Sequence, residues 1–186
     1  MADVVGKSIP AALLMATFQA SLKAMLAAKP TLLELAQGLN SCTCTQSGEG
    51  RRFTTAFLAE FDFRTGAMMY VNAGHNYPIL QRSAGQVERC ETGGLPFGIK
   101  REARYEVGTT CLEAGDLLLI FTDGVAEAVN ENEEEYSEPR LLDRFQQITR
   151  ESADASLNAL MTDLNQFVGQ ARQHDDMTWL IVSITG

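Results

Sequence analysis

The spacing of apolar and polar positions changes several times along the chain. Between residues 8 and 30, apolar side chains recur at the three- and four-residue intervals of one helix face. We expect this helix to have Ser8 as its N-cap, to end before Pro30 and to be buried within a soluble protein. Thr31 and Glu34 then form a capping-box pattern, which predicts a second helix reaching about Cys42. The apolar positions of the first helix are Leu14, Phe18, Leu22 and Met25.

From residue 53 the pattern becomes that of β-strands joined by short turns. Because such connections are short, the strands they join must be antiparallel. Leu117–Phe121 is apolar at every position and is expected to be a central strand buried on both faces. The expected strands are residues 53–61, 67–73, 79–82, 87–90, 105–111 and 117–121.

Two more helical patterns, at residues 138–151 and 153–172, lead to a closing strand at residues 177–182. Before them, residues 130–135 form an acidic stretch that we expect to be an exposed loop. Helices and strands are therefore grouped instead of alternating, which indicates an α+β fold and argues against repeated βαβ units.

Composition excludes several classes of protein. A length of 186 residues with 45% hydrophobic and 21% charged residues fits one soluble domain with a sizeable core. The net charge of −9 and the lack of clustered basic residues argue against nucleic-acid binding. The adjacent basic pair Arg51 and Arg52 lies in a polar loop and is interpreted as solvated charge in preference to a phosphate site.

No membrane segment is expected, because polar residues interrupt the apolar stretch 9–28 and no basic segment precedes it. The four cysteines lack the spacing of a zinc site, which indicates reduced thiols and a cytoplasmic protein. They are Cys42, Cys44, Cys90 and Cys111.

Acidic residues stand at the edges of three predicted core elements. Asp123 follows the buried strand and precedes Gly124, so it is either the N-cap of a short helix at residues 125–128 or a metal ligand. Asp3 precedes the first helix, and Asp175 with Asp176 precedes the closing strand. If the fold brings these carboxylates together, they require cations. Oxygen ligands without His or Cys suit Mg²⁺ or Mn²⁺.

Such ions would activate water for attack on phosphorus, so the chain would need no side-chain nucleophile. The sequence contains neither a Gly-x-Ser-x-Gly nor a Cys-x₅-Arg pattern, and no Gly-rich phosphate loop or dinucleotide fingerprint. Of the two histidines, His75 lies in a tight turn and is interpreted as structural in preference to catalytic. His174 could donate a hydrogen bond to the neighbouring Asp175.

Six short motifs occur in order along the chain and together carry a family resemblance. They are Asp3-x-x-Gly6-Lys7-x-Ile9-Pro10-Ala11-Ala12-Leu13, Phe53-x-Thr55-Ala56-Phe57, Asn72-Ala73-Gly74-His75-Asn76-x-Pro78, Gly94-Leu95-Pro96-x-Gly98, Thr122-Asp123-Gly124-Val125 and Asp175-Asp176-Met177-Thr178. Over essentially its whole length the chain resembles the bacterial metal-dependent protein serine/threonine phosphatases of the SpoIIE and RsbU type. These form the bacterial branch of the PPM (protein phosphatase 2C-like) family.

The resemblance implies an α-β-β-α sandwich of two antiparallel sheets flanked by helices, with two Mn²⁺ or Mg²⁺ ions at one end. By position, Asp3 resembles the aspartate that bridges both ions, Asp123 and Asp175 resemble further ligands, and the carbonyl of Val4 is an additional candidate. Asp176 would then lie beside the metal ions without binding them. Residues with an outer-shell or structural role would be Gly6, Gly124, His75 and Asp176.

The implied reaction is attack of metal-bound hydroxide on phosphoserine or phosphothreonine of an anti-sigma-factor antagonist, a step in sigma-factor regulation. Family members carry an upstream Gly-Gly-Asp ligand, and their Gly-Lys-Gly reads Gly6-Lys7-Ser8 here. We therefore expect residues 1–186 to be a single phosphatase domain, incomplete at its N-terminus and lacking its first strands. An upstream sensory or response-regulator domain is then expected, and a homodimer is left open.

Two other functions stay open. The chain could be a non-catalytic module of this fold that binds a phosphoprotein or a partner domain. It could also hydrolyse small phosphoesters, which only the resemblance argues against.

Overall fold

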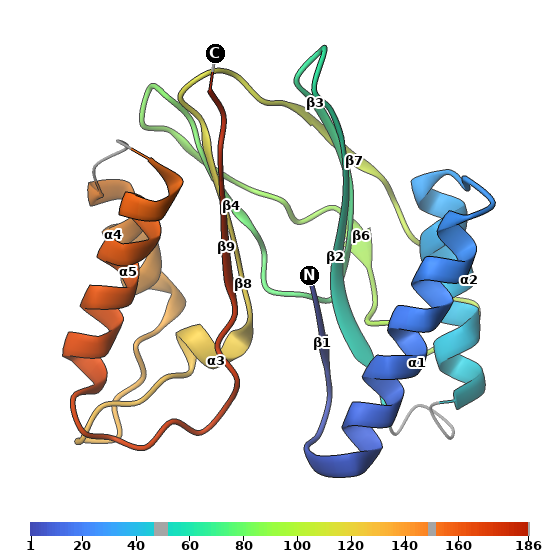
Figure 1. Cartoon of the computed structure of the whole chain (residues 1–186), viewed down its shortest axis with the longest axis horizontal. Helices are drawn as coiled ribbons and strands as arrows, with labels where there is room; N and C mark the ends of the chain where they lie inside the picture. The colour runs from blue at the N-terminus through green and yellow to red at the C-terminus, as the bar shows by residue number, and fades with distance from the viewer. Residues whose placement is uncertain (47–51, 149–151, 186) are drawn as a thin grey trace. The chain divides into compact units, whose positions relative to one another are not determined.

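The computed structural model describes residues 1–46, 52–148 and 152–185. The chain folds into two compact units that interleave along the sequence (Figure 1). The N-terminal unit consists of Met1–His75 and Cys90–Cys111, and the C-terminal unit consists of Asn76–Arg89 and Leu112–Gly186. Most of the predicted polar loop with Arg51, and the end of the helix predicted to residue 151, lie outside the described residues.

The N-terminal unit contains a five-stranded sheet. Its centre is a hairpin of β2 (Thr54–Asp62) and β3 (Ala67–Ala73), close to the predicted bounds. β1 (Ala2–Val4) pairs with the free side of β2, and both β7 (Gly108–Cys111) and β6 (Gly93–Gly94) pair with β3. β6 runs parallel to β3; no short turn joins these two strands, so the pairing does not contradict the antiparallel order expected of strands that short turns join. β1 and β6 were not predicted, because segments of three and two residues are too short to show alternation.

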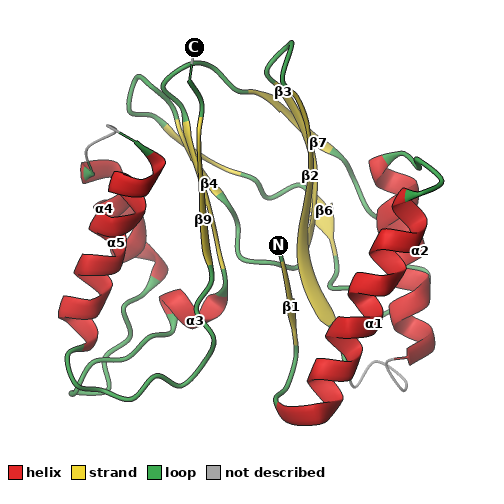
Figure 2. Ribbon diagram, in the orientation of Figure 1, coloured by secondary structure: helices red, strands yellow, loops and turns green. Residues whose placement is uncertain are grey.

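Helices α1 (Ser8–Leu26) and α2 (Leu32–Gln46) cover one face of this sheet (Figure 2). The predicted capping box begins α2: the backbone N–H of Thr31 donates to Glu34 at 2.8 Å, and that of Glu34 donates to Thr31 Oγ1 at 3.3 Å. The cluster between helices and sheet includes Phe18, Leu35, Ala36, Leu39, Ala56, Val71, Ala73 and Phe97.

The prediction that α1 is a buried helix is wrong. Only Leu14 and Phe18 of its apolar stripe are buried, whereas Ile9 is 74% and Leu13 63% exposed. Ser8 is not the N-cap either: Lys7 occupies that position in extended conformation, and Ser8 has a φ of 71°. By length and composition, α1 meets the criterion for a membrane-crossing helix, a weak test that soluble core helices also satisfy.

The C-terminal unit contains a four-stranded antiparallel sheet. In spatial order its strands are β5 (Val87–Arg89), β4 (Ile79–Gln81), β8 (Leu117–Phe121) and β9 (Trp179–Ser183). All five residues of β8 are buried between two neighbouring strands, as its unbroken apolar run predicts.

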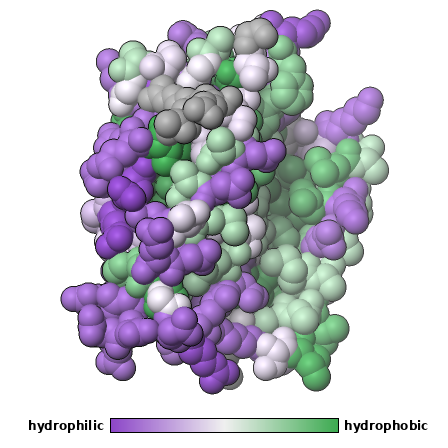
Figure 3. All heavy atoms as spheres, turned by 60° about the vertical axis from the view of Figure 1, so that its left-hand side comes forward, coloured by the Kyte–Doolittle hydropathy of each residue, from purple (hydrophilic) through white to green (hydrophobic). Residues whose placement is uncertain are grey.

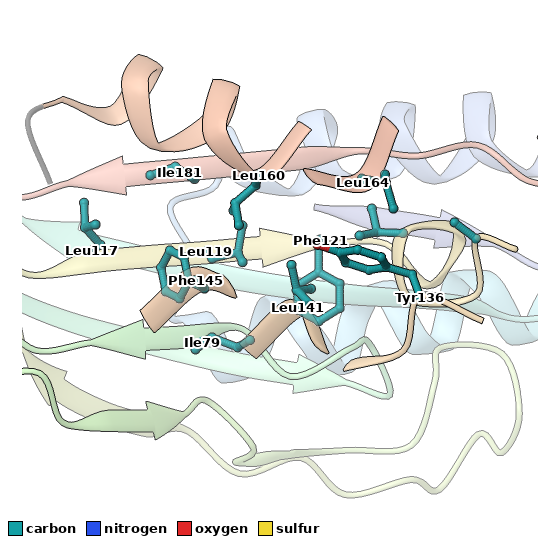
Figure 4. Close-up of a cluster of buried hydrophobic side chains, with 12 residues drawn as sticks. Ile79, Leu117, Leu119, Phe121, Tyr136, Leu141, Phe145, Leu160, Leu164 and Ile181 are labelled. Atoms are coloured by element: carbon teal, nitrogen blue, oxygen red, sulfur yellow. The ribbon is translucent and has the colours of Figure 1, made fainter. Parts of the chain in front are cut away.

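The described residues of this unit also form helices α3 (Asp123–Ala126), α4 (Glu138–Gln147) and α5 (Ala153–Val168). Side chains from α4 and α5 meet those of β4, β8 and β9 in one buried cluster (Figure 4). Its residues include Ile79, Leu117, Leu119, Phe121, Tyr136, Leu141, Phe145, Leu160, Leu164 and Ile181. Figure 3 shows that hydrophilic residues predominate on the side where Figure 1 draws α4 and α5.

Each unit therefore pairs a largely antiparallel sheet with helices on one of its faces, which confirms the predicted α+β class.

Candidate metal centre

The C-terminal unit brings Asp123 and Asp175 to the same edge of its sheet. β8 and β9 are antiparallel with Phe121 opposite Trp179, so the residues that follow β8 lie beside those that precede β9. Thr122 joins the two segments. Its N–H donates to the carbonyl of Thr178 at 3.1 Å, and its hydroxyl accepts from the N–H of Thr178 at 3.0 Å.

The same hydroxyl donates to the carbonyl of Asp176 at 3.2 Å. Thr122, and not Asp123, is the N-cap of α3, so the alternative that Asp123 serves as a cap is wrong by one position. Asp123 is the first residue of that helix.

Gly124 makes this approach possible. A β-carbon on Gly124 would lie 2.4 Å from the carbonyl oxygen of Asp176 and 3.3 Å from Cβ of Asp175. Each of the two carboxylates also accepts from the next backbone N–H, Asp123 from Gly124 at 2.8 Å and Asp175 from Asp176 at 2.9 Å. These bonds orient both side chains relative to their own backbone.

Glu127 adds a third acidic side chain that the sequence reasoning missed. Its N–H donates to the carbonyl of Asp123 at 2.9 Å, within the first turn after β8. Partial desolvation raises the pKa of Glu127, although its side chain is exposed, and the negative charges of Asp123, Glu135 and Asp175 raise it further. The negative charge gathered here is the kind that a divalent cation relieves. The available signal was the four-residue spacing from Asp123, which places both residues on one side of a helical turn.

Asp3 belongs to the N-terminal unit. It is the middle residue of β1 and lies opposite Thr55 of β2. Its neighbour Ala2 packs against the cluster under α1 and α2, and Val4 is buried. Because successive side chains of a strand point to opposite faces, the Asp3 side chain lies on the face turned away from those helices. Gly6, which follows the strand, has a φ of 95°, a conformation that favours glycine.

His75 lies on the same face as Asp3 and is buried. Its Nδ1 is 3.0 Å from Thr55 Oγ1, and its N–H donates to Oδ1 of Asn72 at 2.8 Å. Burial lowers the pKa of His75 to about 4, and the positive charge of the chain's amino terminus lowers it as well. The ring is therefore neutral at neutral pH. His174, in contrast, is exposed in the segment before β9.

The predicted site residues thus fall into two sets. Gly124 and the three aspartates Asp123, Asp175 and Asp176 lie together in the C-terminal unit, while Asp3, Val4, Gly6 and His75 lie in the N-terminal unit. Across residues 1–46, 52–148 and 152–185, no three His, Cys, Asp or Glu side chains are arranged to hold a metal ion. The donors that do converge are carboxylates, which fit Mg²⁺ or Mn²⁺ better than a soft metal.

Comparison with known proteins identifies the family. The model of the stage II sporulation protein E (SpoIIE) family matches residues 1–185. The chain belongs to the SpoIIE family. This agrees with the six ordered motifs, because the match extends from the Asp3 segment to the end of β9.

Among relatives, the phosphoserine phosphatase RsbU of Bacillus subtilis is 29% identical over 133 residues, which cover 71% of this chain and 39% of RsbU. The chain spans 16% to 39% of the length of the curated relatives it matches.

Solved structures share the fold. The RsbU and RsbW domains of Rv1364c from Mycobacterium tuberculosis match with a TM-score of 0.76 and 25% identity, over 97% of this chain and 49% of that one. The SiaA PP2C domain of Pseudomonas aeruginosa matches with a TM-score of 0.86 and 17% identity, over 98% of this chain and 74% of that one. A third match is the catalytic domain of the serine/threonine phosphatase PstP, solved with two manganese ions. Its TM-score is 0.66 and its identity 16%, over 97% of this chain and 84% of that one.

This SpoIIE-family chain therefore has the PP2C fold.

Proposed function

We propose that the chain is the catalytic domain of a Mn²⁺- or Mg²⁺-dependent protein serine/threonine phosphatase. The observation that carries this proposal is the pairing of Asp123 with Asp175 beside Gly124 in a SpoIIE-family chain. The phosphatase name of the relative RsbU supports it. On this proposal both units contribute to one domain spanning residues 1–186.

The proposed metal ligands are the side chains of Asp3, Asp123 and Asp175, with the carbonyl of Val4. When bound, two such ions lower the pKa of a water molecule and neutralise charge on the phosphoryl group. Gly124 lets the segment before β9 approach α3, and Thr122 holds that segment through its hydroxyl. Glu127 adds negative charge beside Asp123 and Asp175, which strengthens cation binding.

The proposed substrate is a phosphoserine or phosphothreonine on an anti-sigma-factor antagonist, acting in the cytoplasm. The resemblance to RsbU-type phosphatases supports this choice, as does the match to an RsbU domain that shares a chain with an RsbW domain. All four cysteines are thiols, consistent with a reducing compartment. An upstream sensory or response-regulator domain and a homodimer are part of the same proposal.

The test is hydrolysis of a phosphorylated antagonist protein with and without Mn²⁺. Asp3→Ala, Asp123→Ala and Asp175→Ala should each reduce the rate by roughly 100-fold or more, since losing even an outer-shell partner of a metal costs about 10- to 100-fold. Asp176→Ala is the matched control and should keep the wild-type rate. The contact of Asp176 with Thr122 is made by its backbone carbonyl, which the substitution keeps. Wild-type hydrolysis by Asp123→Ala would refute the proposal.

A non-catalytic binding module is the second candidate. The departure of Gly6-Lys7-Ser8 from the Gly-Lys-Gly of the family favours it. Calorimetric titration with Mn²⁺ separates the two candidates, because a binding module should take up no ion at Asp3 and Asp123. Comparing turnover of p-nitrophenyl phosphate with that of a phosphoprotein tests the small-molecule alternative.

A further inference from the structure

Polar groups link His75, in the loop that follows β3, to the backbone of Asp3 through the side chain of Thr55. Thr55 stands opposite Asp3 in the pairing of β1 with β2, and its Oγ1 lies 3.5 Å from the carbonyl oxygen of Asp3. The same Oγ1 lies 3.0 Å from Nδ1 of His75. The hydroxyl of Thr55 therefore stands between the imidazole and the peptide group that joins Asp3 to Val4.

The backbone around His75 is held tightly. Asn72, itself buried, accepts the N–H of His75 and donates from Nδ2 to the carbonyl of Cys90 at 3.3 Å. Gly74 has a φ of 65°, and a β-carbon there would lie 2.4 Å from the ring of Pro96. The position of the imidazole is thus set by its surroundings and not by a flexible loop.

The surroundings also favour one tautomer of His75. The neutral ring carries a single proton, and Nε2 is buried with no hydrogen-bond partner among the described residues. A proton on Nε2 would leave an orphaned N–H donor, which folded proteins avoid more strictly than an unsatisfied acceptor. A proton on Nδ1 can instead be donated to Thr55, which frees the hydroxyl proton of Thr55 for the carbonyl of Asp3.

We propose that His75 and Thr55 are positioning residues for the metal ligands of β1. Nδ1–H of His75 donates to Thr55, and the hydroxyl of Thr55 donates to the carbonyl of Asp3. This inference rests on the proposed function, in which the Asp3 side chain and the Val4 carbonyl bind metal. The oriented peptide group lies between those two ligands, so its orientation affects the direction of both. Outer-shell partners of this kind change metal affinity by roughly 10- to 100-fold.

Calorimetric Mn²⁺ titration of four variants tests the proposal. Thr55→Val removes the hydroxyl and keeps the branched shape, and His75→Gln moves the polar group away from the Nδ1 position. Both should weaken Mn²⁺ binding by roughly 10-fold. Thr55→Ser keeps the hydroxyl and His75→Asn keeps an amide near the Nδ1 position, so both should bind Mn²⁺ close to the wild-type affinity. Wild-type affinity in Thr55→Val, or equal losses in all four variants together with lowered melting temperatures, would overturn the proposal.

A second measurement uses the wild-type chain and Thr55→Ser, both without metal. Long-range ¹H–¹⁵N correlation spectra distinguish the protonated from the bare ring nitrogen of His75. The proposal expects the proton on Nδ1 in the wild type and in Thr55→Ser. A proton on Nε2 in the wild type would overturn it.

Asp3→Ala and Asp123→Ala distinguish failure of this inference from failure of the proposed function. If either variant abolishes Mn²⁺ binding and phosphatase activity while Thr55→Val changes neither, only the positioning role is wrong. If Asp3→Ala binds Mn²⁺ and hydrolyses phosphoprotein as the wild type does, the metal site itself is misassigned and the positioning role fails with it.

Discussion

Replacement of Gly124 by alanine tests the contact that brings Asp123 and Asp175 together. The new methyl group would lie 2.4 Å from the carbonyl oxygen of Asp176 and 3.1 Å from its carbonyl carbon. The first distance must grow by about 1 Å to reach ordinary van der Waals contact. Both neighbours are backbone atoms, so the segment before β9 must move away from α3.

The expected cost follows from opposing effects. Overpacking of a tight site costs about 1–3 kcal/mol, and the hydrogen bonds of Thr122 to this segment are worth about 0.5–1.5 kcal/mol each. In the opposite direction, alanine in a helical position stabilises the fold by about 0.5–1 kcal/mol relative to glycine. We therefore expect Gly124→Ala to lower the free energy of unfolding by about 1–2 kcal/mol, with Mn²⁺ affinity reduced by roughly 10-fold because Asp175 is displaced.

Urea denaturation and Mn²⁺ calorimetry measure the two effects. Gly38→Ala in α2 is the matched control, because its methyl group would meet the flexible side chain of Met25, with Sδ at 3.0 Å. This control should leave Mn²⁺ binding unchanged and should not reproduce the loss of stability. Wild-type stability and Mn²⁺ affinity in Gly124→Ala would refute the argument that the close approach of these backbones positions the carboxylates.

Three further predictions concern stability. Thr31→Ala removes the cap of α2 and should cost about 1 kcal/mol in urea denaturation, and Glu34→Gln should cost less. Tyr136→Phe removes a 2.7 Å hydrogen bond to Asp163 and should cost about 1.5–3 kcal/mol, as measured by the same method. Burial raises the pKa of Asp163, but hydrogen bonds from Tyr136 and Arg144 and the charges of two arginines outweigh it and hold the pKa below its usual value. Because the folded-state pKa is lowered, this stabilisation is present above the unfolded pKa of 3.8 and is lost as the pH falls through the folded value. Asp163→Asn should therefore flatten the fall in melting temperature on acidification, and an unchanged acid profile would contradict that role.

The sequence by itself determined the features that depend on neighbouring residues. The unbroken apolar run of β8 required burial on both faces, the capping box marked the start of α2, and the ordered motifs led to the SpoIIE family. Periodicity failed where segments were too short, as at β1 and β6, and where an apolar helix was taken to be wholly buried, as at α1.

Only the tertiary structure decided which distant groups meet. It placed Asp175 beside Asp123 through the register of β8 with β9, added Glu127 to the same acidic site, and put His75 next to Thr55. The approach of Asp175 to Asp123 and the contact of His75 with Thr55 join residues far apart in the chain, and their energies depend on strand register and burial. Local patterns of apolar and polar residues specify neither strand register nor burial. They could therefore indicate Asp123, Asp175 and His75 as candidates, but they could not show which of these side chains are neighbours.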